Sequence, residues 1–364
     1  MGMSRRSDRF ATIRSSMKKP QTVGIRELAA HLGMAISTVS RAMNDRSEVS
    51  PETRKRILAE AERLGYRPNQ SGRSLRSGST KAIALTMRTD IGRTMSGETF
   101  FMALSEGLQS TLANVGYDLM ILPCASDQDE NEFLYRAVDR RLADGFIISN
   151  VQRIDPRIDY LRKWHMPFVA LGSSETKGDY AALDLDFAGV AEASVQRLTT
   201  RGHKRILLGL TAQETNNNYV FLAGFKAGLE KSGLAFDERL VLRLHDRISG
   251  GYELASTLLA MDDRPTAALL IQETMAMGFY QRLGEAGLQP GKDLAVIGFR
   301  ENPVCRYLTP SLTSFRIDLK HYGARLGEII IAELDAAAKG ADRSDFIREV
   351  WPMGLVPGKS DEAA

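Results

Sequence analysis

The residues best suited to binding chemistry lie near the N-terminus, where three hydroxyl side chains and one guanidinium fall between positions 37 and 41: Ser37, Thr38, Ser40 and Arg41. An arginine can bond a guanine edge through two hydrogen bonds, and a serine can donate to several base edges. Short hydroxyl side chains at a helix start also reach phosphate oxygens without reading sequence. The combination favours contact with DNA, although these four residues alone would be better explained as part of an ordinary amphipathic helix.

Residues suited to catalysis are scarce. Gly358-Lys359-Ser360 resembles the end of a phosphate-binding loop, but Met353 stands where that loop requires its first glycine. The five histidines are scattered, and no Ser or Cys lies in a nucleophile elbow. Cys124 and Cys305 have no nearby Cys or His partners, so we expect two reduced core thiols rather than a disulfide or zinc cluster. The sequence therefore predicts a protein that is not an enzyme and that holds no metal or cofactor.

Charge is distributed unevenly along the 364 residues. Residues 1–80 carry 16 Lys and Arg against 7 Asp and Glu, a balance of +9, and because the whole chain carries +3 the remainder carries −6. This asymmetry suggests a polyanion bound at one end, although a solvated basic face would give the same pattern. No apolar run approaches the roughly 20 residues of a membrane helix, and residues 1–19 lack the apolar stretch of a signal peptide. We therefore expect a cytoplasmic protein without membrane contact, and a disordered basic extension at residues 1–20.

Three short helices are expected to position the hydroxyl and arginine side chains. The first covers residues 24–31 and ends at Gly33, and the second runs over about 35–44. The third has Ser50 as its N-cap and Pro51 in its first turn. Two helices around a glycine turn form a helix-turn-helix, whose second helix fits the DNA major groove. With Val39 and Met43 of the second helix facing inward, the side chains left outside are Ile36, Ser37, Ser40 and Arg41.

Three colinear stretches within residues 22–76 carry a more specific pattern: Ile36-Ser37-Thr38-Val39-Ser40-Arg41-Ala42-Met43-Asn44, Val49-Ser50-Pro51-Glu52-Thr53-Arg54 and Leu64-Gly65-Tyr66-Arg67-Pro68-Asn69. This pattern resembles the lactose-repressor (LacI/GalR) family of transcription regulators. Ala35 departs from this pattern, because the family usually has Ser or Thr there. The second helix, which is the recognition helix, therefore lacks a side-chain cap at its start. The resemblance implies base contacts by Ile36, Ser37 and Arg41, and phosphate contacts by Thr38, Ser40, Asn44, Ser50 and Thr53.

Residues 69–80 connect the helix-turn-helix domain, at about 21–68, to the rest of the chain. They resemble the hinge helix of the same family, which folds when paired hinges enter the minor groove. The resemblance makes Asn69 and Leu75 DNA contacts, with Leu75 as an apolar wedge between base steps. Gly72 replaces the usual Ala and costs about 1 kcal/mol of helix propensity, so we expect the hinge to be disordered without DNA.

Beyond Lys81, short apolar runs alternate with helix-length stretches. Such alternation predicts an α/β body of doubly wound parallel sheets, with ligands bound beyond the carboxyl ends of the strands. We expect two interleaved lobes within 81–358, one formed by about 81–181 plus 312–340 and the other by about 182–311 plus the tail. The runs expected as strands are 82–86, 119–122, 145–148, 168–171, 206–210, 268–271 and 295–298.

The resemblance to the family extends into this body, where it implies a periplasmic-binding-protein-like sensor. It is carried by Arg201-Gly202-His203-Lys204-Arg205-Ile206, Ala223-Gly224-Phe225 and Val296-Ile297-Gly298-Phe299. Strand ends then supply candidate effector contacts, whose aromatic rings and converging polar groups suit a polyhydroxylated ligand such as a sugar. These candidates are Phe100, Phe101, Phe221, Gln272, Glu273, Arg300 and Glu301.

Two departures from the family bear on the ligand. Phe221 stands where the family often has an effector-binding Arg, and Arg300 stands where it usually has an Asp. An arginine in the site would suit a carboxylate or phosphate as well as a hydroxyl. We expect Arg300 to pair with Glu301 or Glu273, which would leave a neutral surface for hydroxyl groups.

The sequence therefore predicts a homodimeric, sequence-specific transcription regulator, and more specifically a repressor. Its expected partners are double-stranded operator DNA of near-palindromic sequence and a small-molecule effector, for which the resemblance favours a carbohydrate. Two alternatives share the same body fold: a two-lobed sugar-binding protein, which as a transport component would need export, and an enzyme.

Overall fold

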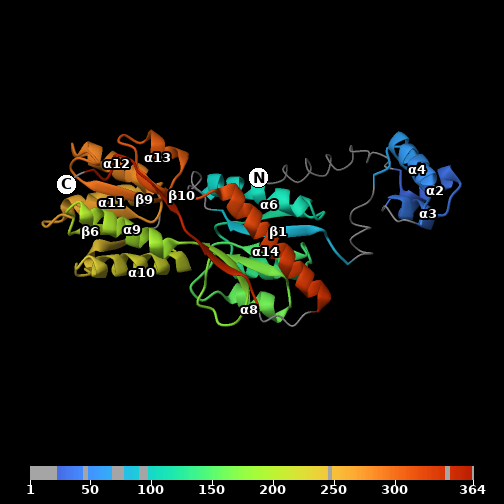
Figure 1. Ribbon diagram of the computed structural model, residues 1–364, viewed down its shortest axis with the longest axis horizontal. Helices are drawn as coiled ribbons and strands as arrows, with labels where there is room; N and C mark the ends of the chain where they lie inside the picture. Colours follow the sequence, from blue (N-terminus) through green and yellow to red (C-terminus); the bar gives the residue numbers. More distant parts are fainter. Residues whose placement is uncertain are drawn as a thin grey trace, which may run out of the picture. The chain divides into compact units, whose positions relative to one another are not determined.

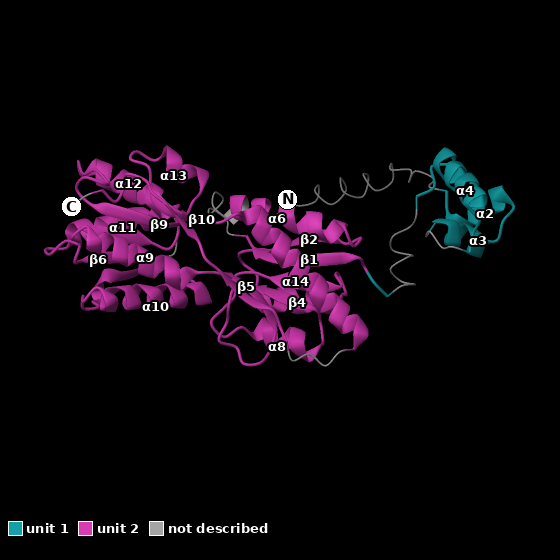
Figure 2. Ribbon diagram, viewed as in Figure 1, with its two compact units in different colours: residues 1–79 teal, residues 80–364 magenta. Residues whose placement is uncertain are grey.

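The computed structural model divides the chain into two compact units, residues 1–79 and residues 80–364, each with its own apolar core (Figure 2). Among the described residues, no helix is long and apolar enough to cross a membrane. The predicted extension at 1–20 and most of the predicted hinge at 69–80 lie outside the described residues. The structure describes residues 23–43, 48–67, 78–89, 97–244, 248–340 and 345–362.

The first helix of the smaller unit begins and ends where local sequence directs. α2 (Ile25–Leu32) follows Gly24, whose backbone N–H donates to the Glu27 carboxylate at 2.7 Å. It ends at Gly33, where φ is 63° and where glycine alone carries no Cβ penalty. The sharp left-handed turn at Gly33 sets the direction of the helix that follows.

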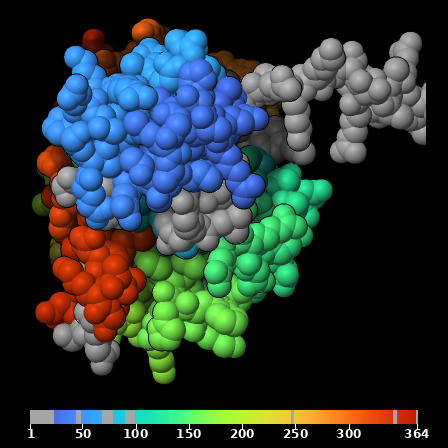
Figure 3. Space-filling view, turned by 90° about the vertical axis from the view of Figure 1, so that its right-hand side faces the viewer, coloured from blue at the N-terminus to red at the C-terminus, as the bar shows by residue number. Residues whose placement is uncertain are grey.

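That following helix is α3 (Ile36–Met43), and α4 (Pro51–Arg63) completes a three-helix head. α4 begins at Ser50, whose Oγ accepts the Thr53 backbone N–H at 3.3 Å. The side chains of the head form one compact block in the space-filling view (Figure 3). The buried apolar side chains of its core are Leu28, Ala29, Leu32, Val39, Ala42, Ile57 and Ala61.

The larger unit consists of two lobes, each built on a six-stranded sheet covered by helices on both faces (Figure 1). The strands of the first lobe are β1 (Ala82–Arg88), β2 (Asp118–Cys124), β3 (Gly145–Ile148), β4 (Phe168–Leu171), β5 (Ala181–Leu185) and β11 (Arg348–Trp351). Their order is β11-β5-β4-β3-β1-β2, and every neighbouring pair is parallel. The helices are α6 (Gly97–Ala113), α7 (Glu130–Asp139), α8 (Pro156–Lys163) and α14 (Leu319–Lys339).

Alternation along β1 shows how this sheet buries both faces. Ile83 and Leu85 belong to the apolar cluster under α6 and α14, whereas Ala82 and Ala84 belong to the cluster under α7 and α8. β1 therefore buries apolar side chains on both faces of the sheet, and its polar residues, Thr86 and Arg88, lie toward its carboxyl end.

The second lobe is built on β6 (Ile206–Thr211), β7 (Val241–Leu244), β8 (Ala267–Leu270), β9 (Ala295–Arg300), β10 (Thr313–Arg316) and β12 (Gly354–Val356). Their order is β12-β10-β9-β8-β6-β7, parallel except for the antiparallel pair β10 and β12. The helices are α9 (Phe187–Thr200), α10 (Asn216–Lys231), η1 (Glu238–Leu240), α11 (Ile248–Ala260), α12 (Met275–Glu285) and α13 (Pro303–Tyr307). Helix α9 packs on α10 so closely that a Cβ at Gly224 would lie 2.3 Å from the Ala188 carbonyl oxygen.

The chain crosses between the lobes after β5, after β10 and between β11 and β12. These points correct two expected boundaries. The boundary at 181/182 cuts through β5, which pairs with β4 in the first lobe. The segment beginning at 312 contains β10, which pairs with β9 in the second lobe. Each strand includes a charged residue, Asp184 in β5 and Arg316 in β10, so neither produced the continuous apolar run from which strands were predicted.

Candidate functional site

Burial within α3 determines which of its side chains face outward. Val39 and Ala42 are fully buried in the head core and fix the rotation of the helix. Met43, expected to face inward, is half-buried and packs against the head core, and Ala42, which was not singled out, is fully buried there. The residues predicted to contact bases, Ile36, Ser37 and Arg41, are exposed, and the predicted phosphate contacts Thr38 and Ser40 are half-buried.

Arg41 has a neighbour that the sequence did not single out. Its Nε lies 3.1 Å from Oε2 of Glu48, and the two side chains are 56% and 60% exposed. An exposed ion pair of this kind contributes at most about 1 kcal/mol and is weakened by salt. DNA can therefore replace Glu48 as the partner of Arg41 at little cost.

Ser50 and Thr53, predicted to hold phosphates, are bonded to each other at the start of α4. The Ser50 hydroxyl donates to the Thr53 hydroxyl at 2.8 Å and accepts the Thr53 backbone N–H. In the structure these hydrogen bonds cap the start of α4. That Ser50 and Thr53 also contact DNA phosphates stays a prediction. Asn44, Asn69 and Leu75 lie outside the described residues.

A cavity of about 220 Å³ lies where the carboxyl ends of strands from both lobes meet, as expected for parallel α/β sheets. Its aromatic lining is Phe100, Phe101, Phe187, Phe299 and Tyr322. Its uncharged polar lining is Ser149, Asn150, Ser173, Thr211, Gln213, Thr215, Asn217 and Gln272. Its charged lining is Arg88, Asp184, Glu273 and Arg300.

Arg300 enters this cavity from the end of β9, and its charge is matched there. Its Nη2 lies 3.1 Å from Oε1 of Glu273, and Asn302 Nδ2 donates to the same oxygen at 3.3 Å. The guanidinium also lies 4.7 Å from the ring centroid of Phe100, which packs edge-to-face against Phe101. The expected pairing of Arg300 with Glu273 is confirmed, so this wall presents donors without an excess charge.

Two of the predicted effector contacts do not line the cavity. Phe221 is fully buried in the core and packs edge-to-face on Phe299, at 5.8 Å between ring centroids. Glu301 pairs with Arg306 at 2.8 Å and with Arg316 instead of Arg300. The hydrogen bond from Arg316, followed by that from Arg306, lowers the pKa of Glu301 to about 2. Both predictions are corrected: an apolar ring at position 221 joins the core, and two arginines hold Glu301 outside the cavity.

The first lobe contributes cavity residues that sequence reasoning missed. Arg88 ends β1, Asn150 follows β3 and Asp184 lies near the end of β5. The strand-end rule could have found Arg88 and Asn150, because strands were expected at 82–86 and 145–148. Asp184 accepts backbone N–H groups from Ser173 at 2.9 Å and Leu185 at 2.8 Å, and burial raises its pKa. No sequence signal marked Asp184, since its strand was not predicted.

A head that exposes an arginine-bearing recognition helix, joined to a two-lobed body with a polar and aromatic cavity, defines the ligand-sensing class of DNA-binding regulators. Matches to known families agree with this. Residues 24–69 match the family described as bacterial regulatory proteins, lacI family, and residues 195–360 match the periplasmic binding protein-like domain.

Individual relatives cover nearly the whole chain. The HTH-type transcriptional regulator AglR of Rhizobium meliloti is 30% identical over 341 residues, which cover 92% of this chain and 93% of that protein. Catabolite control protein A of Priestia megaterium is 29% identical over 293 residues, covering 80% and 86% respectively. A lac repressor dimer bound to operator and the anti-inducer ONPF is 20% identical with a TM-score of 0.80, covering 94% of this chain and 100% of that chain.

The chain belongs to the LacI family of bacterial regulatory proteins. It is a DNA-binding transcription regulator controlled by a small-molecule effector. The fold class expected from the sequence, a helix-turn-helix head with a two-lobed periplasmic-binding-protein-like body, is confirmed.

Proposed function

We propose that the chain is a cytoplasmic repressor that binds its operator as a homodimer and senses a small neutral sugar in the cavity between its lobes. The observation that carries the ligand proposal is the charge balance of the cavity. Arg300 is paired with Glu273 and Arg88 with Glu130, both at about hydrogen-bond distance, 3.1 Å and 3.0 Å. Anions would have to compete with these carboxylates, whereas hydroxyl groups would find donors and acceptors already fixed.

The rest of the cavity favours the same ligand class. Aromatic rings from both lobes and uncharged hydroxyl and amide side chains surround one small space of about 220 Å³. This volume lies below the roughly 300–1,000 Å³ of drug-sized pockets, which favours a compact ligand. Two solved structures of similar fold are complexes with sugars: a regulator named CelR with cellobiose, 23% identical with a TM-score of 0.69, and a LacI family regulator from Enterococcus faecium with ribose, 22% identical with a TM-score of 0.63.

The homodimer is proposed because one head contacts only a short stretch of DNA. A single recognition helix reads only a few base pairs, so specific binding needs two heads on two half-sites of a near-palindrome. We assign the dimer interface to the body, as residues 80–364 form the larger packed unit. Non-enzymatic function is part of the proposal, because the relatives named above are regulatory proteins and the arginines of the cavity are engaged in ion pairs with glutamates.

The ligand proposal is tested by calorimetric titration of the full chain with neutral sugars and the corresponding sugar phosphates. Ribose, glucose and cellobiose provide the neutral panel, and ribose 5-phosphate and glucose 6-phosphate the charged one. We expect binding from the neutral panel. Binding only to phosphates, abolished by Arg300→Ala, would show that the cavity recognises an anion.

A further inference from the structure

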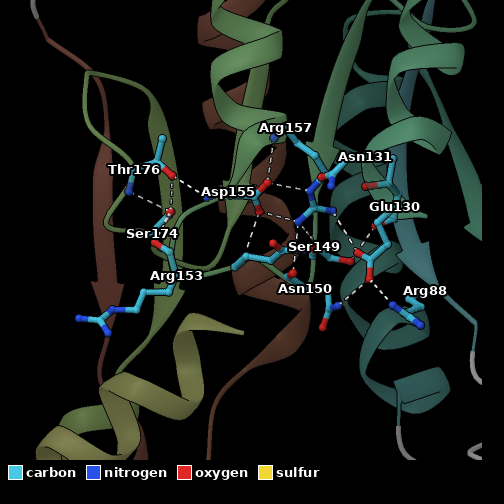
Figure 4. Close-up of polar contacts among 12 residues, drawn as sticks. Arg88, Glu130, Asn131, Ser149, Asn150, Arg153, Asp155, Arg157, Ser174 and Thr176 are labelled. Carbon is cyan, nitrogen blue, oxygen red and sulfur yellow. Dashed lines mark hydrogen bonds and ion pairs between the residues drawn. The ribbon is translucent and has the colours of Figure 1, made fainter. Parts of the chain in front are cut away.

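Glu130, the first residue of α7, does not line the cavity but holds two residues that do. Its Oε1 accepts a hydrogen bond from Arg88 Nη1 at 3.0 Å and another from Asn150 Nδ2 at 3.0 Å (Figure 4). The carboxylate itself is only 8% exposed. A single buried oxygen therefore fixes one charged donor and one amide group of the first-lobe wall, and Figure 4 shows the Asn150 side-chain oxygen turned away from Glu130.

Arg157, which is 2% exposed, contacts the other carboxylate oxygen of Glu130. Arg157 Nη1 donates to Glu130 Oε2 at 3.3 Å, while its Nε and Nη2 donate to Asp155 at 2.9 Å and 2.7 Å. Two arginines thus face two carboxylates, and the cluster carries no net charge. Burial alone would lower the pKa of Arg157. The hydrogen bond and the negative charge of Asp155 outweigh this effect, so the pKa of Arg157 is raised. A buried cluster with its ion pairs matched can act as a rigid support.

The segment between these anchors, residues 149–155, also meets the second lobe. The Val151 carbonyl accepts the Asn216 backbone N–H at 2.9 Å, and Gln152 forms a β-bridge with Thr215. The Arg153 guanidinium lies 4.8 Å from the ring centroid of Tyr219. Residues 215–219 belong to the start of α10, so one short loop faces the cavity and holds the other lobe.

The position of that loop is set by the same cluster. Asp155 Oδ2 accepts the Gln152 backbone N–H at 3.0 Å, and Arg157 Nη2 donates to the carbonyls of Ser149 at 3.1 Å and Asn150 at 3.2 Å. The Asp155 backbone N–H donates to Thr176 at 2.7 Å, which ties the loop to the segment after β4. Hydrogen bonds from buried groups therefore fix both ends of residues 149–155.

We propose that Glu130 is a positioning residue of the effector site, which holds Arg88 as a neutralised donor and Asn150 as an acceptor for adjacent hydroxyl groups of a neutral polyol. Through Asn150 it also sets the 149–155 loop against α10, so that ligand contact and lobe closure depend on the same carboxylate. The polyol part rests on the proposed function. The positioning part is a property of the body alone and can be tested without operator DNA or a sugar.

The substitution Glu130→Gln removes the negative charge of residue 130 and leaves its shape nearly unchanged. The variant keeps nearly the same volume and an oxygen acceptor, and Arg157 keeps its two hydrogen bonds to Asp155. Arg88, however, loses the Glu130 carboxylate and keeps the Ser126 carbonyl as an acceptor for its Nη2 at 3.2 Å, so its positive charge is less compensated on the cavity wall. We therefore expect the variant to gain affinity for inorganic phosphate, by about tenfold over the parent in calorimetric titration, since guanidinium–phosphate hydrogen bonds are charge-assisted.

The double variant Glu130→Gln, Arg88→Ala identifies the origin of that gain. If Glu130 acts on Arg88, phosphate affinity in the double variant returns to the parent value. Phosphate binding by the basic head is common to all three proteins and cancels in the comparison. A Glu130→Gln variant that binds phosphate no better than the parent, or a gain that survives Arg88→Ala, would overturn the proposal.

Lobe closure is measured by hydrogen exchange of the Asn216 amide, which bonds the Val151 carbonyl. In Glu130→Gln we expect this amide to exchange about tenfold faster, with no change in the β3 amides, which report general unfolding. Asp139→Asn is the matched control on the same helix, because its carboxylate accepts the Tyr160 hydroxyl at 2.7 Å on the exposed side. Equal acceleration in Asp139→Asn, or none in Glu130→Gln, would contradict the positioning role.

Asn150→Gly provides a second variant should Glu130→Gln not fold. Asn150 has φ 57°, a conformation that glycine adopts without strain, so the substitution removes the link to Glu130 and leaves the backbone intact. We expect faster exchange at Asn216 without a gain in phosphate affinity, because Arg88 keeps Glu130. Unchanged exchange at Asn216 would overturn the loop part. Failure of every sugar and operator to bind, with these outcomes intact, would refute the proposed function and not the positioning role.

Discussion

The head and the body each present an arginine paired with a glutamate at the same distance, and burial gives the two pairs opposite uses. Arg41 and Glu48 in the head lie 3.1 Å apart with side chains 56% and 60% exposed. Arg300 and Glu273 in the body also lie 3.1 Å apart, but are 11% and 4% exposed. An exposed pair is nearly neutral in energy and can be exchanged for a DNA contact, whereas separating a buried pair leaves an uncompensated charge. The head arginine is therefore free to change partner, and the cavity arginine is not.

The largest effect expected from this difference is in Glu273→Ala. The substitution leaves Arg300 buried without its carboxylate, and we expect the body to lose about 3–5 kcal/mol of unfolding free energy. Both tryptophans of the chain, Trp164 and Trp351, lie in the body, so urea unfolding followed by tryptophan fluorescence reports this unit. Glu48→Ala is the control and should leave the same transition in place. A loss below about 1 kcal/mol in Glu273→Ala would mean that the buried pair behaves like the exposed one.

Arg41→Ala should have the next largest effect, on DNA rather than on stability. If Arg41 reads a base edge, its removal costs about 1–3 kcal/mol per contact and relaxes base preference at one position in each half-site. Competition binding with operators substituted one base pair at a time measures both quantities. Arg26→Ala, on the exposed side of α2, removes the same charge as a control. Uniform weakening across all operators by Arg41→Ala would assign Arg41 to phosphate instead.

Glu301 should give a smaller, pH-dependent effect. Its pKa is lowered to about 2 by Arg316 and Arg306, so its stabilising contribution is complete above its ordinary pKa of 4.5 and is lost as pH falls toward 2. Because Arg306 and Arg316 are 68% and 57% exposed, we expect only about 1 kcal/mol at pH 7. Urea unfolding of the parent and Glu301→Gln at pH 7 and pH 3 should show the gap between them shrinking. A gap independent of pH would refute this electrostatic origin.

The smallest effect is expected from Glu48→Gln. Releasing Arg41 from an exposed pair should raise operator affinity by less than about fivefold, corresponding to at most about 1 kcal/mol, and the gain should fade as salt rises. Filter binding at low and moderate salt measures it. A gain of more than a hundredfold would mean that Glu48 restrains Arg41 far more strongly than an exposed pair can.

Local signals predicted the head well, and long-range contacts limited prediction of the cavity. Gly33, Ser50 and the apolar spacing of the head act within a few residues, so each could be read from sequence. Glu130, by contrast, meets Arg157 across 27 positions, and no local pattern marks that pairing. The prediction that Phe221 contacts the effector was wrong. It was carried over from a position where the family often has Arg, although the residue here is Phe.

Strand prediction failed for a related reason. The strands that contain continuous apolar runs were expected, whereas β5, β7, β10, β11 and β12 were not. β5, β7, β10 and β11 each include a charged residue that interrupts the apolar run, and β12 has only three residues. The crossing points between the lobes depend on β5 and β10, so they could not be located before the sheets were seen.

The most direct test of the whole account is the operator affinity of the full chain measured with and without a sugar that binds the cavity. An operator is first selected from random duplex DNA, and its dissociation constant is then measured across the neutral sugar panel at fixed salt. The account predicts a near-palindromic site and a change of about 5–150-fold in affinity with at least one neutral sugar, the range of a coupling of about 1–3 kcal/mol. Selection of no preferred sequence, or sugar binding that leaves operator affinity unchanged, would contradict it.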